Sequence, residues 1–402
     1  MPLPNPLHDL HAQAEAEFQP YADLEIVSTF GEPQAEYAAV RKSCALIDLP
    51  QRGILELTGK DRLSFLNNLV SNNTWDKNTK SGLAAGKGVY AFFLNLRGRI
   101  VADVNVLELG ERMLVETDAR IVEILRATWD KYLFVEKVTM TNRVGSLHEM
   151  ALHGPGALAV LREAGGADVP ELGVLDSTPV KLFDVQAVVW RDDPCAAPGY
   201  HVIVPTDSAR TVWMNLLSRF STPTETGKRA LRPAGWAAFN ATRIEGGRPI
   251  FDIDFPGAPP DRPGAKLKPD EAEQAASGAP SSPGAGVLPA ETGQAARALS
   301  YTKCYLGQEI VARMHARGQV ARMIVGVRME SDALPIAGSP VFDEARNQVG
   351  AVTSSTLSPV LSNVAICLAL VKKPHFTEGT TLNIPAEGAV RKGTVVKLPF
   401  VG

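Results

Sequence analysis

Residues 300–318 decide how the rest of this sequence is interpreted: Ser300-Tyr301-Thr302-Lys303-Cys304-Tyr305-Leu306-Gly307-Gln308-Glu309-Ile310-Val311-Ala312-Arg313-Met314-His315-Ala316-Arg317-Gly318. Ile310, Val311 and Met314 recur at helical spacing, so the second half is predicted to be a helix. Cys304 lies just before the predicted N-terminus of this helix and next to Lys303. A helix dipole and a neighbouring ammonium both favour a thiolate over a thiol. We therefore predict that Cys304 is a reactive thiolate. The alternative, a small buried hydrophobic residue, fits less well with the polar residues around it.

The same stretch resembles a family signature. Residues 303–309 are similar to the Lys-Gly-Cys-Tyr/Phe-x-Gly-Gln-Glu motif of YgfZ-type folate-binding proteins, relatives of the glycine-cleavage T-protein (GcvT, aminomethyltransferase). The glycine between lysine and cysteine is absent here. The resemblance implies that Cys304 and Lys303 carry the chemistry. The residues expected to support the motif are Tyr305, Gly307, Gln308, Glu309 and Arg313.

Further segments resemble the T-protein family in register, over nearly the whole chain after residue 22. They are Arg41, Asp48 to Pro50, Gly59-Lys60-Asp61, Phe65-Leu66, Gly86 to Tyr90, Leu94 to Gly98, Arg243 to Pro249 and Leu288-Pro289-Ala290-Glu291. The resemblance implies a tetrahydrofolate pocket with contributions from Tyr90, Asp103, Asp118, Arg243 and Glu245. Each has a structural alternative: Tyr90 as a core residue, Arg243 and Glu245 as an exposed helical pair, and the two aspartates as turn or cap residues.

Composition sets the broad class. With 402 residues, 45% of them hydrophobic and 21% charged, the chain is long enough for two or three globular domains. A formal net charge of -3 gives no global attraction to nucleic acid or anionic membranes, so we expect neither as a constitutive partner. The four cysteines lack metal-ligand spacing, so no metal site is expected. The absence of a signal-like start and of a long apolar run makes the cytoplasm the expected location.

Alternating short strands and helices with hairpin-type turns indicate an α+β fold. Residues 1–22 are predicted to be a poorly packed start with a short helix over His8 to Phe18. Pro256 to Ala298 is rich in proline and glycine and poor in large aliphatic residues, which is typical of a flexible insertion. After Gly318, short strands without helices predict a small barrel.

The T-protein resemblance implies two ferredoxin-like α+β domains around a folate pocket, followed by a C-terminal β-barrel. The expected boundaries are 23–50 with 145–254 for a discontinuous folate-binding first domain, 51–144 for the second domain, 255–298 for the flexible insertion, 299–322 for the cysteine motif and connecting helix, and 323–402 for the barrel.

Two carboxylates of the family's transferases are missing at the matching positions. The transferases carry paired aspartates where this chain has Ala102-Asp103, and a Tyr-Thr-Gly-Glu where it has Cys195 to Pro198. Loss of both groups would weaken the positioning that one-carbon transfer needs. We therefore expect a tetrahydrofolate-binding factor that supports assembly or repair of iron–sulfur clusters, including those of tRNA-modifying enzymes. Its partners would be folate and iron–sulfur client proteins.

Two alternatives remain open. One is a folate-dependent aminomethyltransferase of the glycine-cleavage type, in which Asp103 takes over the missing partner's role. The other is a folate-binding scaffold without chemistry, in which Cys304 is inert.

Overall fold

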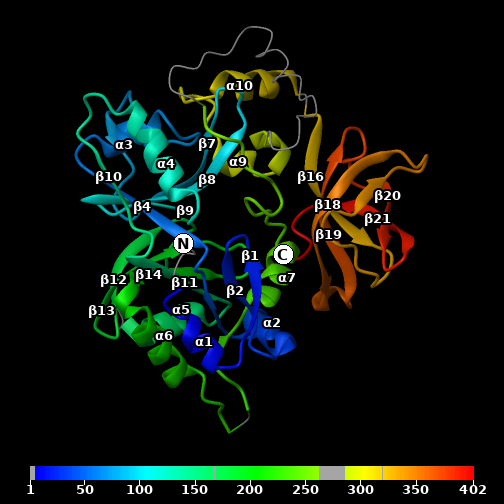
Figure 1. Cartoon of the computed structure of the whole chain (residues 1–402), viewed down its shortest axis with the longest axis horizontal. Helices are drawn as coiled ribbons and strands as arrows, with labels where there is room; N and C mark the ends of the chain where they lie inside the picture. The colour runs from blue at the N-terminus through cyan, green and yellow to red at the C-terminus, as the bar shows by residue number, and fades with distance from the viewer. Residues whose placement is uncertain (1–4, 166–168, 226, 262–285, 319) are drawn as a thin grey trace. The chain divides into compact units, whose positions relative to one another are not determined.

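The computed structural model describes residues 5–165, 169–225, 227–261, 286–318 and 320–402 (Figure 1). The chain forms two compact units. Unit 1 comprises Met1–Arg62, Gly82–Val89 and Asn105–Thr242, and unit 2 comprises Leu63–Ser81, Tyr90–Val104 and Arg243–Gly402. The chain therefore passes between the units several times, and neither unit is one continuous segment.

A six-stranded sheet organises unit 1. Its strand order is β12-β13-β14-β11-β3-β15, antiparallel throughout except for the parallel pair β15 and β3. The strands are β3 (Ala45–Asp48), β11 (Leu147–His153), β12 (Ser177–Leu182), β13 (Val185–Arg191), β14 (Gly199–Pro205) and β15 (Arg232–Pro233). The remaining elements of this part are α1 (His8–Gln13), β1 (Glu17–Tyr21), β2 (Leu24–Thr29), α2 (Pro33–Lys42), α5 (Ala157–Gly165) and α6 (Thr206–Phe220).

The two faces of this sheet bury different cores. Met150 on β11 shares one buried cluster with Leu161 of α5 and Trp213 of α6. Because successive strand residues point to opposite faces, the neighbours of these side chains face the other way. On that other face, Trp190 and Ile203 join a cluster with Ile54, Leu107 and Leu114.

A second sheet has the order β10-β4-β9-β8-β7. Its strands are β4 (Arg52–Thr58), β7 (Gly88–Leu94), β8 (Ile100–Glu108), β9 (Arg112–Asp118) and β10 (Thr139–Asn142). The neighbouring elements are α3 (Arg62–Asn67), β5 (Trp75–Asp76), β6 (Ser81–Gly82), α4 (Val122–Trp129) and η1 (Asp130–Tyr132). Strands β7 and β8 contribute residues to both units.

A closed barrel forms the C-terminal part of unit 2, with strand order β16-β19-β18-β17-β20-β21 (Figure 1). Val325, Val327 and Met329 alternate along β16 and point into a common apolar core. The barrel strands are β16 (Arg322–Met329), β17 (Pro340–Phe342), β18 (Gln348–Ser358), β19 (Val364–Lys372), β20 (Thr381–Ala386) and β21 (Ala389–Val396), with η3 (Pro359–Leu361) between two of them. The other elements are α7 (Trp236–Glu245), η2 (Pro289–Thr292), α9 (Ala295–Ala298) and α10 (Gln308–Arg317). The predicted α+β class with a C-terminal barrel is confirmed.

The prediction of a poorly packed N-terminus is wrong for the described residues 5–22. The helix expected over His8 to Phe18 ends at Gln13 and is followed by a strand. His11 is buried, and its Nε2 lies 2.9 Å from Oδ2 of Asp48. This contact joins residues far apart in the sequence, which periodicity cannot reveal.

The predicted flexible insertion is only partly covered. Residues 262–285 lie outside the described residues. Residues 286–298, assigned to the same insertion, instead form η2 and α9 and bury Leu288 and Glu291. The prediction is therefore wrong for this last part, because a few well-placed apolar residues suffice to pack it. The finer domain boundaries stay a prediction. Each helix in the described part of the chain is too short or too polar to cross a membrane.

Candidate functional site

Cys304 lies in the loop just before α10 and is exposed to solvent, whereas Cys44, Cys195 and Cys367 are buried. Helix α10 starts after Gly307, which has a φ of 78°. A Cβ at Gly307 would also collide with the carbonyl oxygen of Asn95, so only glycine fits this turn. The position of Cys304 before a helix is confirmed, and the alternative of a buried cysteine is wrong.

The ammonium group of Lys303 forms hydrogen bonds within unit 2. Its Nζ donates a hydrogen bond to Oδ1 of Asn67, at 3.1 Å, and another to the carbonyl oxygen of Asn72. The same nitrogen lies 5.8 Å from the ring centroid of Tyr305. Burial, assisted by the positive charge of Lys77, lowers the pKa of Lys303 to about 7. Near neutral pH this side chain therefore carries its proton only part of the time.

The motif-support residues mainly build the loop and helix. Gln308 is the first residue of α10, and its backbone N–H donates to the carbonyl of Tyr305 at 3.2 Å. Glu309 and Arg313 form an ion pair one turn apart on the solvent side of α10. Tyr305 is buried, which raises the pKa of its hydroxyl.

Tyr90 and Asp103, two of the predicted folate residues, lie together. The Tyr90 hydroxyl on β7 donates to Oδ2 of Asp103 on β8, at 3.1 Å. Two residues that the sequence did not suggest join them. Nε2 of Gln294 donates to the Tyr90 hydroxyl at 3.3 Å, and the guanidinium of Arg297 lies 4.0 Å from the centre of the Tyr90 ring. We call these four residues the Tyr90 cluster.

The structural alternatives for these two residues have different outcomes. Tyr90 is 3% exposed, so its ring is part of the core, yet its hydroxyl is hydrogen-bonded. Asp103 lies in the middle of β8, so its alternative role as a turn or cap residue is wrong. Gln294 and Arg297 fall in the segment predicted to be flexible. The signal that could have revealed them is the pair of polar residues at helical spacing just after Leu288-Pro289-Ala290-Glu291.

Arg243 and Glu245 occupy the end of α7, and both side chains are fully buried. The alternative of an exposed helical pair is therefore wrong. Arg243 forms an ion pair with Asp254, and Glu245 accepts a hydrogen bond from the hydroxyl of Ser358. Asp254 also accepts hydrogen bonds from Thr353 and Ser354 on β18, at 2.7 and 2.6 Å. These contacts tie the last residues of α7, which belong to unit 2, to the barrel.

Asp118 ends β9 in unit 1. Its Oδ1 accepts from the backbone N–H of Arg120 at 2.9 Å, and its Oδ2 accepts from the Tyr21 hydroxyl at 3.0 Å. The Arg120 guanidinium also pairs with Oδ2, at 2.7 Å. The turn role given as its structural alternative is present. A contact with folate stays a prediction for Asp118, as it does for Arg243 and Glu245.

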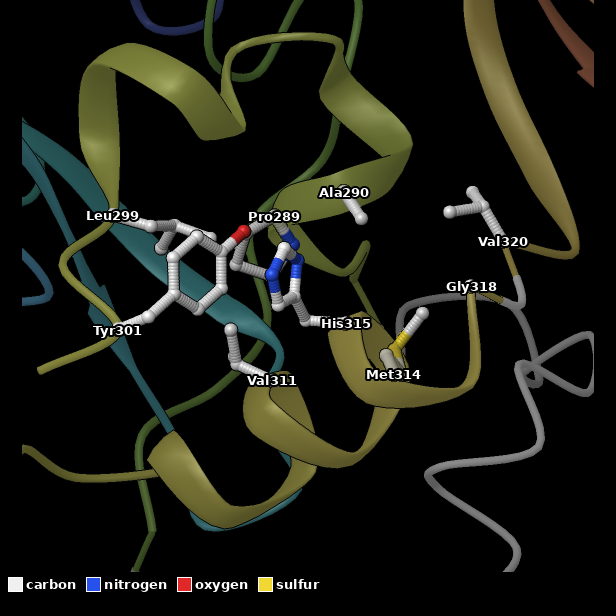
Figure 2. Close-up of a pocket in the computed structure, with 9 residues that line it drawn as sticks. All are labelled: Pro289, Ala290, Leu299, Tyr301, Val311, Met314, His315, Gly318 and Val320. Carbon is white, nitrogen blue, oxygen red and sulfur yellow. The ribbon is translucent and has the colours of Figure 1, made fainter.

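A cavity of about 150 Å³ lies between η2, the chain before Cys304 and α10 (Figure 2). Figure 2 shows the rings of Tyr301 and His315 stacked at its wall, with centroids 4.0 Å apart. The other lining residues are mostly apolar: Pro289, Ala290, Leu299, Val311, Met314, Gly318 and Val320. Small-molecule sites usually enclose roughly 300–1,000 Å³, so this cavity is too small for a pterin with its side chain.

No group of three His, Cys, Asp or Glu side chains suited to a metal occurs among the residues that the structure describes. The site residues predicted from the sequence thus fall into four groups. Lys303 and Cys304 lie on the loop before α10, Tyr90 and Asp103 lie in the Tyr90 cluster, and Arg243 with Glu245 lies beside the barrel. Asp118 belongs to unit 1.

Comparison with known proteins matches this chain to the domains and members of one family. Residues 7–258 match the GCVT N-terminal domain, and residues 322–402 match the glycine cleavage T-protein C-terminal barrel domain. A probable aminomethyltransferase from Pyrococcus abyssi is 26% identical, with 98% of this chain and 96% of the relative covered. An aminomethyltransferase from Bacillus subtilis is 25% identical, with 98% of each covered.

A solved structure, the glycine cleavage system aminomethyltransferase T from Bartonella henselae, has the same fold. It matches with a TM-score of 0.79 at 20% identity, over 98% of this chain and 97% of that chain. Because the N-terminal match alone covers more than half of the sequence, this chain belongs to the glycine-cleavage T-protein family.

Proposed function

We propose that this protein binds tetrahydrofolate at the Tyr90 cluster and acts in one-carbon chemistry. The aminomethyltransferases of this family use tetrahydrofolate. The observation that carries the proposal is the hydrogen bond from Tyr90 to Asp103, supported by Gln294 and Arg297. A pterin ring needs a flat neighbour and polar groups that pair with its donors and acceptors, and these side chains are of the required types.

The first candidate activity is aminomethyl transfer. It is supported by the names of the relatives, which match this chain over almost their full length. In this candidate, Asp103 accepts a hydrogen bond from the reacting nitrogen of the folate and holds it in position. Ala102 stands where the family's transferases have a second aspartate. In this candidate, the carboxylate of Asp103 therefore has to position the folate without a second aspartate beside it.

The second candidate is a YgfZ-type factor that supports iron–sulfur cluster assembly or repair, including clusters of tRNA-modifying enzymes. One specific observation favours it: Cys304, in the motif that resembles the YgfZ signature, is the exposed one of four cysteines. An exposed thiol is accessible to a client protein, whereas the three buried thiols are not. The relatives named above are aminomethyltransferases, so this candidate depends on the cysteine motif alone.

Calorimetric titration with tetrahydrofolate tests the shared proposal. We expect saturable binding by the native protein and at least tenfold weaker binding by Asp103→Asn, because a charged hydrogen-bond acceptor is lost. Asp184→Asn, which removes an exposed carboxylate between β12 and β13, is the matched control and should bind normally. Equal binding by all three proteins would place folate elsewhere.

Two further measurements separate the candidates. Transfer of an aminomethyl group to tetrahydrofolate, abolished by Asp103→Asn and retained by Cys304→Ala, would establish the first. Loss of iron–sulfur enzyme activities in a deletion strain under oxidative stress, restored by the native gene but not by Cys304→Ala, would establish the second. Restoration by Cys304→Ala would eliminate it.

A further inference from the structure

Residues 286–300 are fastened to the rest of unit 2 at both ends. At the start, the carbonyl of Val287 accepts from the N–H of Ile100 at 2.9 Å. At the end, the Ser71 hydroxyl donates to the carbonyl of Ala298 at 2.6 Å, and the Ser300 N–H donates to Ser71 at 2.8 Å. Gln294 and Arg297 lie between these anchors and therefore have a fixed backbone.

The middle of the segment is fixed by Asn72. Its Nδ2 donates at 3.0 Å to the carbonyl oxygen of Tyr90 and, also at 3.0 Å, to that of Arg297. One side-chain amide thus joins the backbone that carries Tyr90 to the backbone that carries Arg297. The two side chains are held in register by this bridge as well as by their own contact.

The hydrogen bonds of Gln294 can run in one direction only. Nη1 of Arg297 lies 3.3 Å from Oε1 of Gln294, and a guanidinium has donors but no acceptor. The amide oxygen must therefore face Arg297. The amide nitrogen then donates to the Tyr90 hydroxyl at 3.3 Å and to the carbonyl of Pro249 at 3.5 Å.

The direction continues through Tyr90. Because its oxygen accepts a hydrogen from Gln294, its own hydrogen is left for Oδ2 of Asp103, at 3.1 Å. The order is Arg297 to Gln294 to Tyr90 to Asp103, with each donor pointing toward the carboxylate. Such a chain polarises each successive bond, and it begins at a permanent cation.

We propose that Gln294 and Arg297 are positioning residues of the folate site, which orient the carboxylate of Asp103 through Tyr90 and compensate for the aspartate replaced by Ala102. The inference depends on the proposed function, because it takes Asp103 as the folate-binding group. Neither Gln294 nor Arg297 needs to touch the ligand. Their effect is to fix which oxygen of Asp103 receives the Tyr90 hydrogen.

The decisive variant is Gln294→Glu, which keeps the shape of the side chain. A carboxylate at this position still accepts from Arg297 but cannot donate to Tyr90. The Tyr90 hydroxyl would then donate to the new carboxylate, and Asp103 would lose the hydrogen bond from Tyr90. We expect tetrahydrofolate binding to weaken at least tenfold, measured by calorimetry, while the thermal midpoint stays within about 3 °C of that of the native protein.

Measuring tetrahydrofolate binding in a Tyr90→Phe background distinguishes a positioning role of Gln294 from a merely structural one. Since the proposed effect passes through the Tyr90 hydroxyl, Gln294→Glu should weaken binding less than threefold further in a Tyr90→Phe background. Arg297→Lys, which keeps the charge, should bind within threefold of the native protein, whereas Arg297→Met should lose about tenfold. This second pair remains informative if Gln294→Glu does not fold.

The outcomes separate the two proposals. If the native protein does not bind tetrahydrofolate, the proposed function fails and this inference fails with it. If the native protein binds and Asp103→Asn does not, but Gln294→Glu and Arg297→Met both bind normally, this inference alone is refuted. Equal further losses from Gln294→Glu with and without the Tyr90 hydroxyl would also refute it, because the effect would then not pass through Tyr90.

Discussion

Replacing Lys303 with methionine removes a charge that burial opposes. The pKa of Lys303 falls from its usual 10.5 to about 7, so between these values the native chain has released a proton that the unfolded chain retains. Stability rises with pH wherever the unfolded state binds more protons. The charged Lys303 therefore costs stability below pH 7, and this cost disappears as the pH rises toward 10.

The size of the effect follows from the shift. A shift of one pKa unit corresponds to about 1.4 kcal/mol, so the full change would be worth about 5 kcal/mol. Lys303 is only partly buried, and its ammonium keeps hydrogen bonds to Asn67 and Asn72. Solvent screening reduces the value for such a group. We expect about 2–3 kcal/mol between pH 6.5 and pH 10.

Urea denaturation at several pH values measures this quantity. The free energy of unfolding of the native protein minus that of Lys303→Met should rise by the expected amount as the pH increases. Lys372→Met, which removes an exposed lysine at the end of β19, is the matched control, and its difference from the native protein should stay flat. A difference for Lys303→Met that is flat, or that falls with pH, would refute the reasoning about burial.

Three other predictions concern stability and thiol chemistry. Iodoacetamide should modify one thiol in the native protein and four after denaturation, because Cys304 is exposed and the other three cysteines are buried. Cys304→Ala should abolish the reaction of the native protein. Modification of a second thiol in the native protein, detected by mass spectrometry, would contradict the burial of Cys44, Cys195 and Cys367. Gly307→Ala should lower stability by about 2–4 kcal/mol in thermal denaturation, because the backbone strain of a positive φ adds to the collision of the new Cβ with the carbonyl oxygen of Asn95. Gly318→Ala is the control: its φ is 59° but the space around it is open, so it should lose only about 1 kcal/mol. Asp254→Asn should cost about 3–5 kcal/mol, because it removes the carboxylate that pairs with the buried guanidinium of Arg243. A loss under 1 kcal/mol in thermal denaturation would show that this pair is not buried in solution.

Local patterns were sufficient for the barrel and for the loop before α10. Val325, Val327 and Met329 share parity, and a strand places alternate residues on one face, so their common core followed from the sequence. The start of α10 after Gly307 followed in the same way from the spacing of apolar residues. The exposure of Cys304 was predicted from its polar neighbours. In each case the deciding information lies within a few residues.

The Tyr90 cluster shows where local patterns fail. Gln294 and Arg297 lie in a stretch whose average composition is that of a flexible segment, and an average over many residues hides the few that pack. The burial of Arg243 was missed for a related reason. Its partner Asp254 lies 11 residues away and reaches it only after the chain folds back. Family resemblance located Tyr90 and Asp103, but it did not indicate which groups orient them.

The closed barrel of unit 2 also affects how molecules of this protein meet one another. A ring of paired strands presents no open backbone edge to which another chain could add a strand. The six-stranded sheet of unit 1, in contrast, ends at β12 and β15. The five-stranded sheet likewise ends at β10 and β7. If copies of this chain aggregate through strand addition, the first contacts should therefore form at the ends of these two sheets and not at the barrel.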